Sequence, residues 1–156
     1  MLTQFSRTEL LLGKEAMDKL KNSRVAVFGI GGVGGYVCEA LVRSGVGAFD
    51  LIDDDKVCLT NLNRQIIATR KTVGKYKADV MKERMLEINP DVDVRIHKCF
   101  FLPENADTTD CTGCQYITGL LPSAYSSSLT LSGTSLPLLS SVSLALKSAS
   151  ASSLTR

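Results

Sequence analysis

The sequence contains little that would place it in a membrane or direct it out of the cell. It has no run of about 18 consecutive apolar residues, the length that a membrane-spanning helix needs. Residues 1–14 mix Arg7, Glu9 and Lys14 with short apolar pieces, so they do not resemble a signal peptide. The five cysteines are unevenly spaced and accompany no export signal, which indicates reduced thiols. We therefore expect a cytoplasmic protein without a membrane partner.

Acidic residues are absent from the chain after residue 110. All 16 acidic residues and 16 of the 18 basic residues occur before residue 111. The 46 residues that follow include 13 serines and 10 leucines, and their apolar positions keep no helix or strand period. We predict two parts, a folded domain over residues 1–106 and a low-complexity, disordered tail over residues 107–156. No further strand or helix is predicted after Asp110.

Two shortages limit the ligands that the sequence can be expected to bind. His97 is the only histidine, and Cys111 and Cys114 lack the second pair that a zinc site needs, so no metal site is predicted within the chain. His97 alternates with apolar residues, which favours a surface position over a catalytic one. The formal net charge is only +2, which neither demands nor excludes a polyanionic partner, because a basic patch can coexist with a balanced total.

Apolar patterning in the first two thirds predicts alternating strands and helices. Short apolar runs indicate buried parallel strands, and apolar residues spaced three and four apart indicate amphipathic helices. The predicted elements are strands over residues 25–28, 48–52 and 92–96, and helices over residues 8–21, 33–44 and 75–89. This order predicts an α/β fold with a Rossmann-like, doubly wound, mainly parallel sheet, of which the N-terminal half is complete. The polar residues 59–72 keep no period and are interpreted as a functional loop.

A glycine cluster follows the first predicted strand and opens the next helix. Gly29 allows a tight turn, and Gly31 and Gly32 let a phosphate approach bare backbone N–H groups. Gly34 lets the helix pack closely on the sheet. Asp53 comes about 20 residues later, where a ribose hydroxyl is expected to be held. The pattern predicts a nucleotide site, and the alternative is that the glycines serve only a tight connection.

The segment after the second predicted strand favours ATP over a dinucleotide. An acidic run ends at Asp55 and is followed by Asn61, Arg64 and Lys77. Two cations and an amide beside a phosphate site can neutralise the β- and γ-phosphates and stabilise the departing pyrophosphate, which a dehydrogenase does not require. The alternative is that Lys75 and Lys77 lie on the solvent-exposed face of a helix.

Several segments resemble the E1-like adenylating enzymes, which include the activators of ubiquitin-like proteins and their ThiF- and MoeB-type bacterial relatives. These segments are GIGGVG at residues 29–34, LIDDDKVCLTNLNRQ at 51–65 and GKYKAD at 74–79. RTELLLGKEAMDKL, which starts at Arg7, and the segment over residues 63–90 most resemble the branch of the family that dehydrates threonylcarbamoyladenosine in tRNA. The resemblance covers residues 4–100 and implies ATP-dependent adenylation of a carboxylate.

The resemblance also implies a role for each matching residue, with ATP and Mg²⁺ as the ligands. The implied nucleotide contacts are Gly32 at the phosphates, Asp53 at the ribose, Asp55 near the nucleotide, Asn61, Arg64 and Lys77 at the phosphates, and Gln65 in the same motif. Arg7 corresponds to the arginine that one subunit of a homodimer donates to the ATP site of the other. The family often has another arginine three residues earlier, where this chain has Gln4.

The implied reaction begins with attack of a carboxylate on the α-phosphate of ATP, which gives an acyl-adenylate and pyrophosphate. In the tRNA branch an internal nitrogen of the modified base then displaces AMP and closes a ring, so modified tRNA is the expected substrate. A ubiquitin-like sulfur-carrier or sulfur-transfer protein is the alternative partner within the family. A nonenzymatic nucleotide-binding pseudoenzyme is the alternative of another class.

The last third departs from the family. Members have a later strand that ends in an aspartate, which helps to hold Mg²⁺ and the adenylate, whereas no acidic residue follows Asp110 here. We hypothesise that the reading frame shifts near residues 107–111 and that adenylation is lost or much reduced; an intact coding frame over this tail would contradict the shift. Loss of the second half of the sheet would leave an unpaired sheet edge and lower the solubility.

Overall fold

Four parallel strands form the sheet at the centre of the fold. The computed structural model describes residues 2–101, 113–119, 130–131 and 134–135. The strands are β1 (Arg24–Phe28), β2 (Ala48–Ile52), β3 (Asp93–His97) and β4 (Tyr116–Gly119), in the order β3-β2-β1-β4 across the sheet. All three neighbouring pairs are parallel. This is a Rossmann-like α/β fold, as the sequence predicts.

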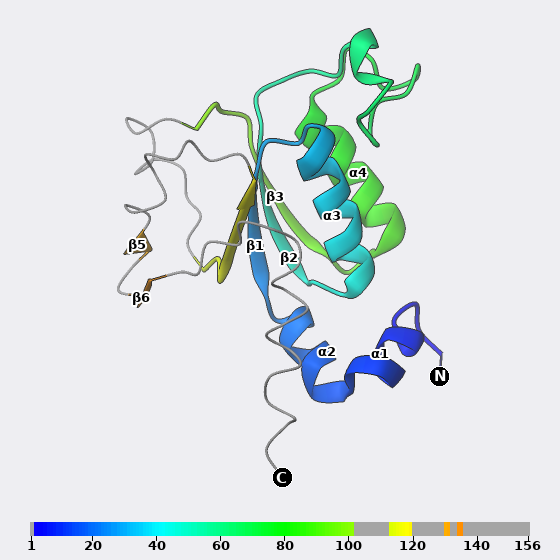
Figure 1. Ribbon diagram of the computed structural model, residues 1–156, viewed down its shortest axis with the longest axis vertical. Coiled ribbons are helices and arrows are strands. Elements are labelled where there is room, and N and C mark those ends of the chain that lie inside the picture. Colours follow the sequence, from blue (N-terminus) through cyan, green and yellow to red (C-terminus); the bar gives the residue numbers. More distant parts are fainter. Residues whose placement is uncertain (1, 102–112, 120–129, 132–133, 136–156) are drawn as a thin grey trace.

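Two helices, α3 (Gly32–Ser44) and α4 (Lys77–Ile88), cover one face of the sheet (Figure 1). Alternate strand residues point toward them and form the main core, whose largest fully buried members include Val27, Phe49, Leu51, Val42, Met81 and Met85. Arg84 of α4 donates to Glu39 of α3, with Nη2 and Oε1 3.0 Å apart, and so joins the two helices. Helix α3 ends at Ser44, as predicted, and Gly45 follows it in a left-handed conformation with φ of 99°.

The N-terminal segment forms two helices, so the single helix predicted over residues 8–21 is wrong. The helices are α1 (Ser6–Leu12) and α2 (Lys14–Lys21). Gly13 separates them with φ of 81°, a conformation that glycine adopts freely and that no helix contains. Both helices lie at the amino ends of the strands (Figure 1). Among the described residues, no helix has the length and apolar character needed to cross a bilayer.

Strand β4 corrects the prediction that no element follows Asp110. It pairs in register with β1, from Val25 opposite Tyr116 to Phe28 opposite Gly119. A strand of four residues with a single fully buried side chain, Ile117, is too short to give a period in the sequence.

Two short antiparallel strands, β5 (Thr130–Leu131) and β6 (Thr134–Ser135), complete the described elements. Most of residues 107–156 lies outside the described residues, including Cys111 of the cysteine pair. The predicted division after residue 106, the frame shift and the disordered tail therefore stay predictions.

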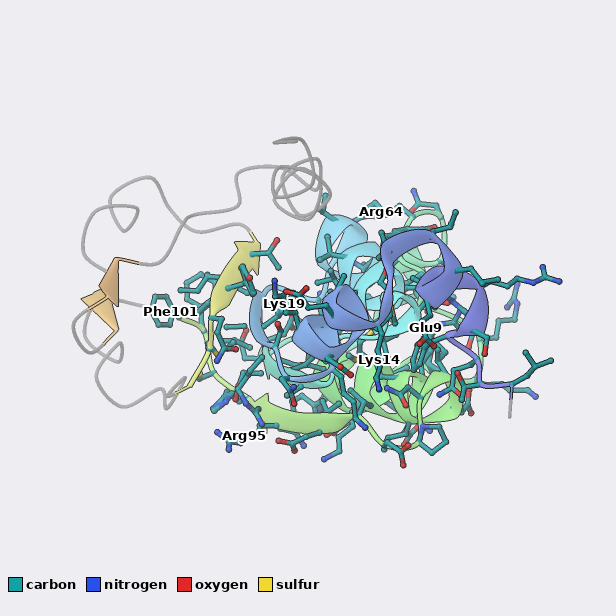
Figure 2. All side chains as sticks on the ribbon, turned by 90° about the horizontal axis from the view of Figure 1, so that it is seen from below. Glu9, Lys14, Lys19, Arg64, Arg95 and Phe101 are labelled. Atoms are coloured by element: carbon teal, nitrogen blue, oxygen red, sulfur yellow. The ribbon has the colours of Figure 1, made fainter. Side chains whose placement is uncertain are left out.

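The face of the sheet away from α3 and α4 carries a second, smaller apolar cluster. It consists of Ala26, Phe28, Ile52, Cys114 and Ile117, with Cys99 and Phe101 packed against it. Figure 2 shows Phe101 on this side, and its ring meets that of Phe28 edge to face at a centroid distance of 4.7 Å. Both faces of the sheet are therefore lined by apolar side chains, as a parallel sheet requires.

A buried carboxylate lies beside this second cluster. Asp50, in the middle of β2, is inaccessible to solvent. Its Oδ2 accepts hydrogen bonds from Arg24 Nη1 at 3.1 Å and from Cys114 Sγ at 3.3 Å, and its Oδ1 lies 2.9 Å from His97 Nε2. His97 is thus half-buried against Asp50, which corrects the predicted surface position. Because a buried charge is stable only when it is paired, these contacts hold β1, β2 and β3 together with Cys114, two residues before β4.

Replacing Arg24 by Met is expected to destabilise the fold by about 3 kcal/mol, because Asp50 would stay buried without its cationic partner. Urea unfolding at equilibrium measures the change. Lys19→Met is the matched control, since Lys19 pairs with Glu15 on the exposed surface of α2 and should contribute little. Equal unfolding midpoints for the two variants would contradict the prediction.

Candidate nucleotide-binding site

The glycine cluster forms the turn at the carboxyl end of β1. Gly29 has φ of 82° and donates its N–H to the carbonyl of Ile52 at 2.9 Å, so it turns the chain beside the end of β2. Helix α3 begins at Gly32, and no side chain of the described residues caps its N-terminus. The first N–H groups of α3 and the positive end of its dipole therefore remain available to an anion.

Gly34 determines how closely α3 approaches the turn. A Cβ atom at Gly34 would lie 1.8 Å from the carbonyl oxygen of Gly29, so no side chain fits there. The predicted close packing of the helix on the sheet is confirmed. A Cβ atom at Gly32 would instead come no nearer than 3.8 Å to any atom, the nearest being the carbonyl oxygen of Arg64. A methyl group at Gly32 would therefore make only ordinary van der Waals contact with Arg64.

Asp53 connects the end of β2 to the glycine turn. Its Oδ2 accepts the N–H of Ile30 at 2.5 Å, and its Oδ1 accepts the N–H of Asp55 at 2.8 Å. Burial raises the pKa of Asp53, against the opposing effects of these two N–H groups and of Lys77. The contact with Ile30 was not predicted, because a backbone N–H leaves no mark in a sequence. The proximity of Asp53 to the turn agrees with the sequence, and its role at a ribose stays a prediction.

Lys77 is a buried cation beside the acidic run. Its Nζ lies 2.6 Å from Oδ2 of Asp55, and its backbone N–H donates to the carbonyl of Asp55 at 3.0 Å. The side chain of Lys77 is 8% exposed and that of Asp55 is 67% exposed, so the pair opens to solvent on the side of Asp55. The alternative that both lysines lie on a solvent-exposed face is wrong for Lys77 and holds only for Lys75, which is exposed.

The loop between β2 and α4 places Asn61 and Arg64 near the turn. It contains a 3-10 turn, η1 (Leu59–Asn61). A hydrogen bond from the N–H of Cys58 to Asn61 Oδ1, 3.0 Å long, stabilises this turn. Asn61 is buried in this structural contact, whereas the side chain of Arg64 is exposed and donates to the carbonyl of Thr60 at 3.1 Å. The carbonyl oxygen and Cγ of Arg64 therefore lie near Gly32, whereas its guanidinium is at the surface.

Gln65 is buried against the turn with an unused hydrogen-bonding atom. It is 7% exposed, and its Nε2 lies 3.9 Å from the position that a Cβ atom of Gly31 would take. Its Oε1 is buried and has no hydrogen-bond partner among the described residues. Since buried polar atoms are nearly always bonded, this oxygen indicates a missing donor at the site.

Arg7 is the one predicted site residue that the fold does not bring to the turn. It is exposed on α1, at the amino ends of the strands, whereas the glycine turn lies at their carboxyl ends (Figure 1). Its predicted role across a homodimer stays a prediction.

Comparison with known proteins agrees with this geometry. The ThiF family matches residues 5–119. The chain belongs to the ThiF family. It is 50% identical over 117 residues to the tRNA threonylcarbamoyladenosine dehydratase of Bacillus subtilis, and 44% identical over 114 residues to that of Escherichia coli. These alignments cover 75% and 73% of this chain.

Solved structures of ThiF-like proteins share the fold. The Escherichia coli dehydratase in complex with ATP matches with a TM-score of 0.74 at 42% identity, over 77% of this chain and 49% of that one. Escherichia coli MccB matches with a TM-score of 0.67 at 30% identity, over 74% of this chain and 36% of that one. The chain spans 46% and 42% of the lengths of the two dehydratases compared above, which is less than half of each. The match to residue 119 includes β4, beyond the domain end predicted at residue 106.

Gly32 and Gly34, in the first turn of α3, should respond differently to replacement by alanine. Gly34→Ala is expected to destabilise the fold by about 3 kcal/mol, because its methyl group would overlap the carbonyl oxygen of Gly29. Gly32→Ala should keep the stability within about 1 kcal/mol, because its methyl group meets only ordinary contacts. Thermal and urea unfolding check both, and a Gly34→Ala protein as stable as Gly32→Ala would refute the explanation.

Proposed function

We propose that the chain binds ATP at the glycine turn and serves the adenylation of a carboxylate. The observation that carries the proposal is a buried cation, Lys77, that acts on Asp53, the carboxylate that holds the glycine turn through the N–H of Ile30. A phosphate chain in this position would accept hydrogen bonds from the N–H groups of the turn and lie close to the Lys77 ammonium. The unsatisfied Gln65 Oε1 would accept a hydrogen bond from a ribose hydroxyl or the adenine amino group of ATP, because the phosphates carry no donor.

Each charged residue has a part in the proposed chemistry. Lys77 and the exposed Arg64 would stabilise the negative charge that develops on departing pyrophosphate. Asp53 would hold the turn in place through Ile30 and present its remaining lone pairs to a ribose hydroxyl. No group of three potential metal ligands occurs among the described residues, so Mg²⁺ would enter with ATP and be held mainly by phosphate oxygens.

The proposed substrate is the threonylcarbamoyl group of a modified adenosine in tRNA. Support comes from the names of the relatives from Bacillus subtilis and Escherichia coli. In the first step a carboxylate oxygen attacks the α-phosphorus of ATP, the bond from that phosphorus to the bridging oxygen breaks, and pyrophosphate leaves. In the second step an internal nitrogen of the modified base attacks the activated carbonyl carbon, and AMP leaves as the ring closes.

Lys77→Met is expected to weaken ATP binding about 10- to 100-fold, the loss of one charge-assisted contact of about 1.5–3 kcal/mol. The fold should persist, because the partner left behind, Asp55, is mostly exposed to solvent. Isothermal titration calorimetry with ATP measures the affinity. Lys75→Met is the matched control: Lys75 lies two residues away, is exposed, and should matter less than twofold. Equal ATP affinity for both variants would contradict the proposed phosphate contact.

Two other functions remain open and can be separated by one assay. A sulfur-carrier activator is favoured by the 39% identity over 95 residues to the probable adenylyltransferase/sulfurtransferase MoeZ of Mycobacterium tuberculosis. A nucleotide-binding pseudoenzyme is favoured by the lack of any acidic residue after Asp110. Pyrophosphate release with modified tRNA supports the dehydratase, release with a carrier protein supports the activator, and ATP binding without release supports the pseudoenzyme.

We also propose that the chain acts in the cytoplasm as a homodimer in which Arg7 reaches the ATP site of the other copy. Leu10 and Leu11, next to Arg7 on α1, are each 86% exposed, which suits burial against a second chain. Sedimentation equilibrium of the protein and of a Leu10→Glu/Leu11→Glu variant tests this: a monomer in both cases would rule it out.

A further inference from the structure

One segment of the chain carries basic residues and no acidic ones. Residues 56–78 contain six lysines and arginines and no acidic residue, whereas the rest of the chain has 12 basic and 16 acidic residues. The net charge of +2 is therefore the sum of a cationic segment and a remaining chain in which acidic residues outnumber basic ones. This segment is the loop between β2 and α4 without its acidic start, residues 53–55, together with the first two residues of α4.

Four of the six cations in this segment have contacts within the fold. Lys77 pairs with Asp55, and Lys75 Nζ lies 3.8 Å from Glu83. Lys56 Nζ lies over the ring of Tyr76, 4.9 Å from its centroid. The fourth, Arg64, donates to the backbone of the same loop. The two that remain are Arg70 and Lys71.

Arg70 and Lys71 occupy the tip of a fixed turn. The N–H of Thr72 donates to the carbonyl of Thr69 at 3.0 Å, and the N–H of Thr69 donates to the hydroxyl of Thr72 at 2.8 Å. The Thr72 hydroxyl also donates to the carbonyl of Ile67 at 2.8 Å, which ties the turn to a buried residue. Arg70 and Lys71 are exposed, and within the described part of the chain neither forms an ion pair. The turn therefore presents two adjacent charges to solvent on a rigid base.

This turn belongs to the same loop that lines the proposed ATP site. Gln65 of the loop lies against the glycine turn, and Arg70 follows it by five residues. Figure 1 shows the loop beyond the ends of α3 and α4, at the carboxyl ends of the strands. A nucleic acid bound by the turn at Arg70 and Lys71 would thus have nucleotides next to the bound phosphates near the proposed ATP site.

We propose that Arg70 and Lys71 bind the phosphate backbone of the tRNA whose modified base enters the ATP site; this inference rests on the proposed function. Two cations side by side on a projecting turn suit successive phosphates of a nucleic acid better than a single small anion, which requires a concave site. Such contacts position the nucleic acid and carry no sequence information. Their free energy comes largely from release of counterions, so it must fall with salt.

The test compares two charge-matched double variants of the full chain with an unmodified tRNA transcript as the probe. Arg70→Gln/Lys71→Gln removes the turn cations. Lys21→Gln/Arg95→Gln removes one exposed lysine and one exposed arginine elsewhere, and Figure 2 shows Arg95 on the opposite side of the molecule from Arg64. Fluorescence anisotropy gives the tRNA affinity between about 50 and 200 mM salt, and calorimetry gives the ATP affinity of each variant.

The turn variant is expected to bind tRNA about 10-fold more weakly, with a slope of log affinity against log salt that is smaller by about 1 to 2. The Lys21→Gln/Arg95→Gln variant should keep both values, and both variants should bind ATP as the parent chain does. Unchanged tRNA binding in the turn variant, an equal loss in the control, or preferential binding of an acidic polypeptide would each overturn the proposal. ATP binding without tRNA binding overturns only this inference, and tRNA binding at the turn without ATP binding overturns only the proposed function.

Discussion

The close approach of α3 to the end of β1 is the constraint on which the rest of the structure depends. Gly34 lies so near the carbonyl of Gly29 that a single methyl group would overlap it. This contact places the first turn of α3 at the carboxyl ends of the strands. No side chain of the described residues caps that turn, so its first N–H groups are available to a ligand. Asp53 then fixes the same turn from β2 through the N–H of Ile30. The anion site is therefore a consequence of helix packing as much as of glycine flexibility.

Charge at the site follows from that geometry. Lys77 begins α4, and its burial is tolerated because Asp55 at the end of β2 pairs with it. The pair faces solvent through Asp55, so a polyanionic ligand could share the lysine without opening the core. On the other face of the sheet, Asp50 is paired by Arg24 in the same way but is closed to solvent. Both are ion pairs that compensate a buried charge. The Arg24–Asp50 pair joins strands of the sheet, whereas the Lys77–Asp55 pair keeps the lysine within reach of a ligand.

Much of the fold and of the candidate site could be predicted from the sequence, because both leave periodic or clustered signals. The strands at residues 25–28 and 48–52 and the αL stop at Gly45 are local features, and the glycine turn follows from residue type alone. The break at Gly13 was missed because the apolar period continues across it. Strand β4 and the contact of His97 with Asp50 depend on long-range pairing, which no single-sequence pattern records.

The order of the strands places the described acidic residues of the candidate site after β2, on one side of β1. Strand β4 lies next to β1 and ends at Gly119, and no acidic residue follows Asp110 in the sequence. Of the carboxylates in the described part of the chain that follow β2 at this end of the sheet, Asp53 accepts two backbone N–H groups, and Asp55 pairs with Lys77. The phosphates of ATP can be held from this one side.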